Sequence, residues 1–335
     1  MADNFATLIK TLERYANLKT IPPRDQLEDL VASVTFLLNN ENPLVRPLDE
    51  DEISGGLIVL REDIPTLVIP DIHGRRDFVM NFLNWNYGPG PVLEGLIKDE
   101  LQVVCVGDGF HTEKRGALRW QEAFQEYALG FKRHRHMDRE MADSMGVMAM
   151  IMLLKRSFPD NFHFLKGNHE NIKNENNHSD RSFGKYAYEG AMVREWVEIF
   201  LGEEFLDEWS AFEQSLPLFV IGENFLVSHA EPLKFHSREE IVNFREDRTV
   251  SFDFSWTGND QSEPGTVEAM LKEYLPGKEK TFYFGGHRPV QNLFQTRAGG
   301  RYVQIHNPEK DIVALLEPGE VIELEKVVKE LKRED

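Results

Sequence analysis

The hydrophobic pattern changes once along the chain, near residue 55. Before that point, LIKTLERYANL (8–18) and DQLEDLVASVTFLLNN (25–40) space their apolar residues three and four apart, which predicts two amphipathic helices. Pro22 and Pro23 lie between these segments, and proline does not continue a helix. After residue 55, short runs of β-branched and aromatic residues predict strands. We therefore expect an N-terminal helical extension over residues 1–54.

Strand patterns alternate with helical patterns over the rest of the chain. The predicted strands lie in the ranges 56–60, 66–71, 102–108, 162–168, 218–230, 281–287, 302–306 and 311–318, with a hairpin turn at Glu223 and Asn224. The helical patterns lie in the ranges 117–130, 140–157, 186–212 and 264–274. This alternation predicts an α/β core with mixed sheets. The charged segment 319–335 is expected to end in a short helix.

The composition is that of a globular protein with little affinity for nucleic acid. A chain of 335 residues, 41% hydrophobic and 28% charged, can bury a large core. The net charge of −19 argues against nonspecific DNA or RNA binding, which needs Lys and Arg to neutralise phosphates. The single cysteine, Cys105, cannot form a disulfide within the chain, which fits a reducing compartment.

Neither a signal-peptide pattern nor an apolar stretch of about 20 residues is present in the sequence. We therefore expect a cytoplasmic protein with no membrane partner.

Side chains with metal-ligating atoms follow five of the predicted strands. In chain order they are Asp71, His73, Asp108, Asn168, His229 and His287. The carboxyl ends of strands in open α/β sheets form ligand crevices, so these residues are expected to meet there. Such a set suits two divalent cations with Asp108 as the shared ligand, and imidazole favours zinc, iron or manganese over calcium.

The order of these motifs resembles a known family. DxHG (71–74), GD (107–108), GNHE (167–170), a His after VS (228–229) and GGH (285–287) are similar to the motifs of the calcineurin-like metallophosphoesterase superfamily. The chain most resembles the phosphoprotein phosphatase (serine/threonine phosphatase) branch. MLLKRSFPDNFHFLKGNHE, FEQSLPLFVIGENFLVSHAEP and FSWTGND are similar to segments of that branch, and the likeness covers roughly residues 55–315.

The resemblance implies a fold and a domain organisation. The fold would be α/β, with two mixed β-sheets packed as a sandwich flanked by helices in four layers, α/β/β/α. This catalytic domain would cover residues 55–318, with an insertion at about 113–143 and a charged tail over 319–335.

The resemblance also implies ligand sets and a reaction. Asp71, His73 and Asp108 would hold the first metal, and Asp108, Asn168, His229 and His287 the second. A metal-bridging hydroxide would hydrolyse the phosphate ester directly, without a phosphoenzyme. His169 would protonate the leaving oxygen, and Glu170 would orient its neighbours.

The loop after Asp108 departs from the family pattern GDxxDRG. Without a gap, His111 takes the place of the Asp that pairs with the His of GNHE, and Thr112 takes the place of the Arg. With a three-residue insertion, Arg115 takes the place of the phosphate-binding Arg, and either Glu113 or His111 partners His169. We favour the insertion, which makes Arg115 a catalytic residue that clamps the phosphate through paired N–H donors.

The phosphate-binding groups differ from those of the branch in other ways. No Arg lies between Trp256 and His287, so Arg75, Arg76 and Arg288 are alternative candidates. His306 ends a further strand and either faces the crevice or lies outside it. The basic segment GFKRHRHMDRE (130–140) either covers the crevice or forms a solvated helical face. Residue 289, the second His position of the GHxH motif of many phosphodiesterases, is Pro here, which favours a phosphomonoesterase.

Three functions are consistent with these residues. The first is a metal-dependent hydrolase of phosphomonoesters, similar to the serine/threonine protein phosphatases, with a phosphorylated protein as its substrate. The second keeps the metals but acts on dinucleoside polyphosphates or another small phosphorylated metabolite, a reading that SHAEP (228–232) supports. The third is a non-catalytic binding module, which all six intact ligand positions disfavour.

Overall fold

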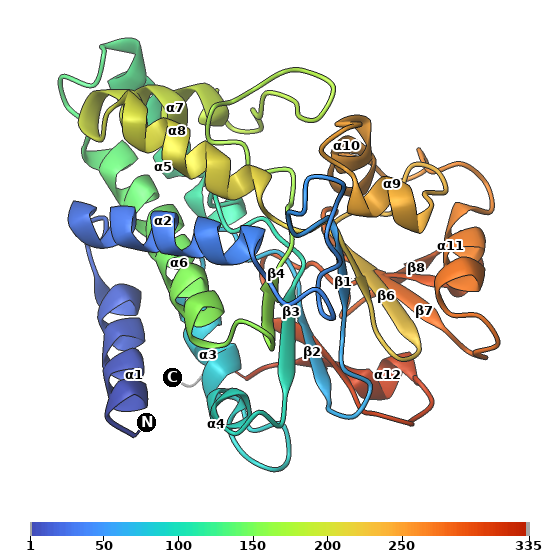
Figure 1. The fold of residues 1–335 in the computed structure, drawn as a ribbon. Coiled ribbons are helices and arrows are strands. Elements are labelled where there is room, and N and C mark those ends of the chain that lie inside the picture. Colours follow the sequence, from blue (N-terminus) through green and yellow to red (C-terminus); the bar gives the residue numbers. More distant parts are fainter. Residues whose placement is uncertain (1, 333–335) are drawn as a thin grey trace.

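Two β-sheets pack face to face between two groups of helices in the computed structural model, which describes residues 2–332 (Figure 1). The five-stranded sheet has the order β11 (Val328–Glu330), β10 (Ile312–Leu316), β2 (Thr66–Ile69), β3 (Gln102–Cys105) and β4 (Phe162–Phe164). Strands β2, β3 and β4 are parallel, β10 is antiparallel to β2, and β11 is antiparallel to β10.

The six-stranded sheet is mixed as well. Its order is β1 (Leu57–Val59), β5 (Phe219–Ile221), β6 (Phe225–Ser228), β7 (Phe282–Gly285), β9 (Tyr302–Gln304) and β8 (Gln295–Arg297). Strands β6, β7 and β9 are parallel, whereas β5 and β8 are antiparallel to their neighbours β6 and β9. Each sheet thus has three parallel strands whose carboxyl ends lie at one edge.

Apolar side chains fill the three spaces between the four layers. Val68 and Val104 of one sheet pack with Val227, Phe284 and Val303 of the other in the central space. The alternating strand residues face outward, toward the helices. The predicted fold class, two mixed sheets packed as a sandwich and flanked by helices, is confirmed.

The larger group of helices covers the five-stranded sheet (left in Figure 1). It consists of α1 (Ala2–Asn17), α2 (Arg24–Asn39), α3 (Arg76–Asn84), α4 (Val92–Ile97), α5 (Ala117–Ala128), α6 (Arg135–Ser157), α7 (Glu189–Phe200) and α8 (Glu203–Gln214). The smaller group, on the six-stranded sheet, consists of α9 (Arg238–Val242), α10 (Thr249–Ser255) and α11 (Thr266–Tyr274). Short 3₁₀ turns lie at Lys114–Gly116 and Ala298–Gly300.

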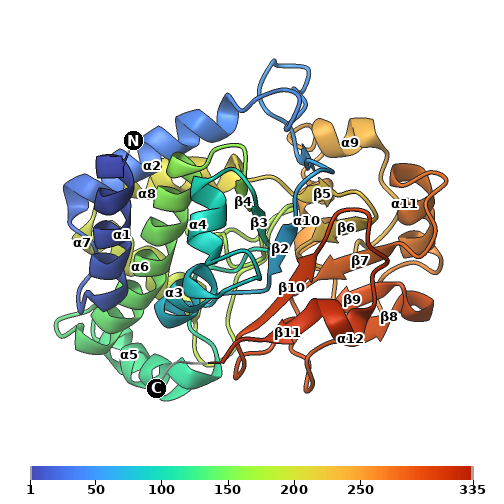
Figure 2. The same cartoon turned by 90° about the horizontal axis from the view of Figure 1, so that it is seen from below.

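The helices predicted at 8–18 and 25–40 are confirmed as α1 and α2, and both pack against the central helix α6 (Figure 2). A buried ion cluster joins this N-terminal segment to the core. The carboxylate of Glu41 accepts hydrogen bonds from Lys155 of α6 and, at 2.7 Å, from Arg46. Arg46 also donates to the carbonyls of Leu38 and Ser215. None of the described helices is long and apolar enough to cross a membrane.

Two predicted helices differ in the structure. The range 186–212 forms two helices, α7 and α8, because the chain turns at Gly202, where φ is 90°. In the tail, a helix is present only as α12 (Leu324–Val327), and β11 follows it directly. Pairing with the free edge of β10 outweighs the helical pattern there. Residues 333–335 of the predicted tail helix lie outside the described residues.

Candidate metal centre

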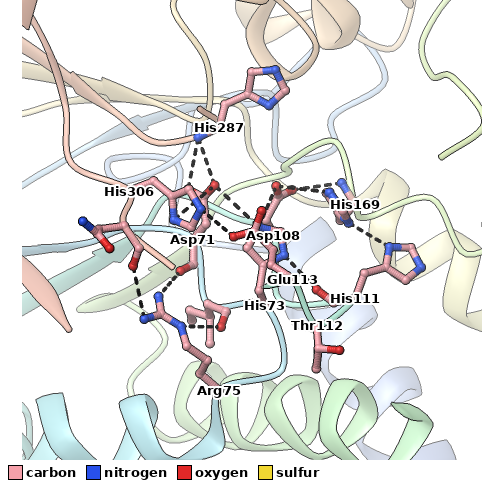
Figure 3. A network of polar contacts seen from close by, with 12 residues as sticks. Asp71, His73, Arg75, Asp108, His111, Thr112, Glu113, His169, His287 and His306 are labelled. Atoms are coloured by element: carbon pink, nitrogen blue, oxygen red, sulfur yellow. Dashed lines mark hydrogen bonds and ion pairs between the residues drawn. The ribbon is translucent and has the colours of Figure 1, made fainter. Parts of the chain in front are cut away.

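The six predicted metal ligands meet where strands of both sheets end. Figure 3 shows Asp71, His73, Asp108 and His287 of this set. Asp71 and His73 follow β2, Asp108 follows β3 and Asn168 follows β4, whereas His229 follows β6 and His287 follows β7. His287 is partly exposed, and the other five residues are buried. The structure therefore brings together side chains from five strands and from both sheets.

The backbone turns sharply at three of these ligands. The angle φ is 47° at His73, 53° at Asp108 and 61° at His287. Residues with a Cβ atom rarely adopt this left-handed conformation, and where they do, the surrounding structure holds them, often at functional sites.

Two glycines allow the carboxylates to approach the neighbouring loops closely. A Cβ atom on Gly286 would lie 1.8 Å from Oδ1 of Asp71, and one on Gly167 would lie 2.2 Å from Oδ1 of Asp108. No side chain fits at either position without displacing a carboxylate. The glycines of the GGH and GNHE motifs are thus required by contact with the ligands.

The first group of ligands surrounds His73. Its Nε2 atom lies 3.8 Å from Oδ2 of Asp71 and 3.6 Å from Oδ2 of Asp108. Two ligand atoms that are each about 2.1 Å from one ion are separated by about 3 to 4 Å. These atoms are too far apart for hydrogen bonds to one another, but their spacing suits a shared cation.

The second group lies on the other side of Asp108. The Nε2 atom of His229 is 3.3 Å from Oδ2 of Asp108 and 3.1 Å from Oδ1 of Asn168. The same Asn168 oxygen lies 2.8 Å from Nδ1 of His287. Oδ2 of Asp108 therefore lies close to an imidazole of each group, which suits a shared ligand.

Backbone carbonyls determine which imidazole nitrogen faces the cluster. Nδ1 of His73 lies 2.9 Å from the carbonyl oxygen of His111, and Nδ1 of His229 lies 3.1 Å from that of Val106. A carbonyl only accepts hydrogen bonds, so both Nδ1 atoms carry a proton and both Nε2 atoms face the cluster, where a cation would take the place of any proton on Nε2. Histidine ligands of metal ions are commonly oriented in this way.

The charges of the cluster also suit bound cations. Burial raises the pKa of Asp108, and the neighbouring Asp71 and Glu170 raise it further. Burial also disfavours the charged form of His73, but Glu113, Asp71 and Asp108 outweigh it and raise the pKa of His73 to about 10. Burial would also raise the pKa of Asp71, but the neighbouring imidazoles outweigh it and lower that pKa. In the metal-free protein, Asp108 and His73 are thus the groups that favour a proton in place of a cation. The donor set fits divalent metal ions.

Comparison with known proteins identifies the family. The sequence model described as calcineurin-like phosphoesterase matches residues 64–322, which is most of the chain. The chain belongs to the calcineurin-like phosphoesterase family. It is accordingly a metal-dependent phosphoesterase. No curated protein sequence matches it.

A solved structure shares the fold of this phosphoesterase, and two others match it at lower scores. A protein serine/threonine phosphatase from Saccharomyces cerevisiae, with similarity to human phosphatase PP5, superposes with a TM-score of 0.58 and 14% identity, over 94% of this chain and 91% of that one. A cold-active protein-tyrosine phosphatase of a psychrophilic Shewanella gives a TM-score of 0.43 and 12% identity, over 85% and 86%. A metallophosphoesterase from Sphaerobacter thermophilus gives 0.33 and 13%, over 81% and 89%.

Glu170 organises the two ligand loops of the phosphoesterase at the ends of β3 and β4. Its carboxylate accepts hydrogen bonds of 2.8 Å from the backbone N–H groups of Asp108, Gly109 and Gly167. One carboxylate thereby fixes both loops, which carry Asp108 and Asn168.

In the loop after Asp108, His111 and not Glu113 contacts His169. Nδ1 of His111 lies 2.8 Å from Nδ1 of His169, and the His111 ring stacks on Phe183. The ungapped alignment gives this contact, and the three-residue insertion allows it as well. The insertion therefore stays a prediction.

The predicted phosphate-binding arginines of the phosphoesterase have other partners. Arg115 donates to the carbonyl of Gly74 and contacts Asp77, and 42% of its side chain is exposed. Arg75 is buried and donates to the carbonyls of Asp71, Ile72 and Lys310, so it supports the β2 loop. Both guanidinium groups thus contact protein groups in this structure, and their role in phosphate binding stays a prediction.

The two remaining candidates differ in exposure. Arg76 bonds to Asp143 and to backbone carbonyls of the N-terminal segment. Arg288 is exposed next to Gly258, one residue after His287, so it stays a candidate for binding phosphate.

Two residues beyond the six ligands also reach the cluster. Oε2 of Glu113 lies 3.8 Å from Nε2 of His73 and 2.8 Å from Nε2 of His306. Oε1 of Glu113 contacts Lys185 at 3.1 Å. The sequence predicted Glu113 to lie near His169 but left open whether His306 faces the crevice. The one sequence feature that pointed to His306 was its position directly after the strand pattern of β9.

Trp120, which lies in the predicted insertion, packs against His111. Trp120 of α5 is buried, packs against the His111 ring with centroids 5.7 Å apart, and donates to the carbonyl of Thr112. The basic segment 130–140 lies at the connection of α5 and α6, where Lys132, Arg133 and Arg135 are exposed. Its contacts are with α5 and α7 and, through the buried Glu140, with Thr112 of the loop after Asp108.

Proposed function

We propose that this phosphoesterase binds two divalent cations and hydrolyses phosphomonoesters. The observation that carries the proposal is the position of Asp108 between two sets of ligand atoms. Oδ2 of Asp108 lies 3.6 Å from Nε2 of His73 on one side and 3.3 Å from Nε2 of His229 on the other. Manganese, iron and zinc suit this mixture of imidazole and carboxylate ligands.

The ligand residues have distinct roles in this proposal. Asp71 and His73 would hold the first cation, Asn168, His229 and His287 would hold the second, and Asp108 would serve both. The cations, when bound, would supply a water of lowered pKa and neutralise charge on the phosphate. The protein holds the ligands in place through Glu170 and through backbone carbonyls.

His169 is the proposed proton donor to the leaving oxygen. Its Nε2 atom lies 3.8 Å from Oδ2 of Asp108, and its backbone N–H donates to Oδ1 of the same residue at 2.9 Å. Both contacts hold the imidazole beside the shared ligand. Its other nitrogen, Nδ1, contacts His111, which positions the ring without touching the reacting atoms.

The proposed substrate is a phosphorylated protein side chain. The order of motifs resembles the serine/threonine phosphatase branch, and the fold is shared with a serine/threonine phosphatase. Pro289, in place of a second His in the GHxH motif, supports a monoester over a diester.

The test is phosphate release by metal-stripped protein with and without added manganese. We expect manganese-dependent hydrolysis of p-nitrophenyl phosphate and of a phosphothreonine peptide, and slower hydrolysis of bis(p-nitrophenyl) phosphate. Asp108→Asn is expected to lose activity. Asp63→Asn is the control, the same substitution at an exposed position, and should keep it. Folded protein that binds two ions but releases phosphate from neither monoester would overturn the proposal. Faster hydrolysis of diadenosine tetraphosphate than of the peptide would assign the enzyme to small metabolites.

A further inference from the structure

His306 follows β9, the strand next to β7 in the six-stranded sheet, and its side chain is fully buried. It belongs to none of the motifs that carry the other ligands. Figure 3 shows its imidazole beside Asp71, facing the same space as His73. We propose that His306 is a fourth protein ligand of the first cation, with Asp71, His73 and Asp108, and that Glu113 orients it. This inference rests on the metal binding of the proposed function.

Hydrogen bonding identifies the nitrogen that is free to bind metal. Nε2 of His306 lies 2.8 Å from Oε2 of Glu113. A carboxylate ion only accepts hydrogen bonds, so Nε2 carries the proton and donates it to Glu113. In the neutral imidazole the lone pair is then on Nδ1, which is buried and has no hydrogen-bond partner among the described residues.

The free nitrogen points into the first group of ligands. Nδ1 of His306 lies 3.7 Å from Oδ2 of Asp71, almost the same distance as the 3.8 Å between Nε2 of His73 and that oxygen. Suitable ligand atoms of Asp71, His73 and His306 all lie within 4.8 Å of one another. A lone pair facing a carboxylate at this distance makes no hydrogen bond, but one cation between them satisfies both.

Glu113 completes a carboxylate–histidine–metal arrangement. A ligand histidine commonly donates its second ring N–H to a carboxylate, which fixes the ring and makes the free nitrogen more basic. The other oxygen of Glu113 contacts Lys185 at 3.1 Å, so both oxygens have partners. Its hydrogen bond to Nε2 fixes the His306 ring, while the same oxygen lies 3.8 Å from Nε2 of His73 at the edge of the first group of ligands.

The position of His306 explains how the chain tolerates Pro289. The backbone N–H of Val290, directly after Pro289, donates to the carbonyl of His306 at 2.8 Å. The two segments are therefore neighbours, and β9 delivers an imidazole next to the loop from which the GHxH motif would supply one.

Metal binding tests the assignment without reference to activity. Metal-stripped wild type, His306→Ala, Glu113→Gln and His236→Ala are titrated with cobalt(II), with bound metal counted by mass spectrometry and ligand geometry followed by visible absorption. His236 is the matched control, because it is also a buried imidazole paired with a carboxylate, Asp253, at 3.0 Å. Circular dichroism checks that each variant is folded, and His306→Gln replaces the alanine variant if that one is not.

We expect wild type and His236→Ala to bind two ions, and His306→Ala to retain one tightly. Glu113→Gln should bind the first cation with about 10- to 100-fold lower affinity than wild type, as is usual when the hydrogen-bond partner of a metal ligand is lost. Added imidazole should restore the second ion and its absorption to His306→Ala. If folded His306→Ala binds two ions as tightly as wild type, the inference is wrong while the proposed function stands. If wild type binds no ion, the proposed function itself fails.

Discussion

The Nδ1 atoms of His111 and His169 lie 2.8 Å apart, within hydrogen-bond distance, so one imidazole donates and the other accepts. The family pattern has an aspartate in the place of His111. A neutral ring thus orients the proposed proton donor here, and Phe183 and Trp120 hold that ring in turn.

Replacement of His169 by Asn should lower kcat by about 10²- to 10⁴-fold, the usual contribution of a general acid. His111→Ala should also lower kcat, with little effect on KM, because it positions His169 and does not touch the substrate. Both variants should bind two ions as wild type does, measured by metal analysis after gel filtration. Loss of metal from either would show that the pair supports the ligands instead.

Gly286→Ala should remove metal binding in a protein that still folds. The added methyl group would lie 1.8 Å from Oδ1 of Asp71, so the carboxylate must move away from the first group of ligands. The matched control is Gly90→Ala, where the only close neighbour is the flexible Glu94 side chain. Titration with manganese monitored by electron paramagnetic resonance checks the result. Unchanged binding in Gly286→Ala would refute the close contact.

Removal of metal should lower the melting temperature. Without cations, Asp71 and Asp108 are buried together, and the opposing charge that favours the folded state is lost. Differential scanning calorimetry with chelator is expected to give a lower Tm, which added manganese restores. In Asp108→Asn, manganese should raise the Tm less than in wild type.

Glu41→Gln should destabilise the fold by about 3 to 5 kcal/mol, because it leaves the buried charges of Arg46 and Lys155 without their carboxylate. Urea unfolding followed by tryptophan fluorescence measures the loss. Glu28→Gln, which removes an exposed ion pair with Arg24, is the matched control and should cost less than about 1 kcal/mol.

The lowered pKa of Glu41 predicts that the free energy of unfolding depends on pH. Burial alone would raise the pKa of Glu41, but Lys155 and Arg46 outweigh it and lower the pKa from 4.5 to about 2. Since the folded pKa is below the unfolded one, the stabilisation is complete above about pH 4.5 and is lost as the pH falls toward 2. The stability difference between wild type and Glu41→Gln should therefore shrink over this range. A difference that is constant from pH 7 to pH 3 would contradict the lowered pKa.

The ligands of this site could be predicted because each directly follows an apolar strand, and strand patterns are local features of the sequence. Their meeting required only that the carboxyl ends of parallel strands lie at one edge. The loop 109–116 could not be aligned in the same way, since the position of the His111 ring depends on packing against Trp120 and Phe183. Phe183 is distant in the chain from His111.

The orientation of His306 escaped prediction for a related reason. A histidine after a strand has no distinguishing local signal, and only the positions of Glu113 and Asp71 show which of its nitrogens is free. If His306 binds the first cation, the argument from Pro289 to a monoester is weaker, because a histidine ligand is supplied from elsewhere. The comparison of monoester and diester hydrolysis then decides the substrate class.

The short strand β11 has a consequence for association between molecules. It pairs with β10 from Ile312 to Ala314 and covers the hydrogen-bonding edge of the five-stranded sheet. If residues 328–330 were displaced, the free N–H and carbonyl groups of β10 could pair with a strand of another copy. By pairing with β10, residues 328–330 therefore oppose edge-to-edge aggregation. This role is separate from the chemistry of the metal centre.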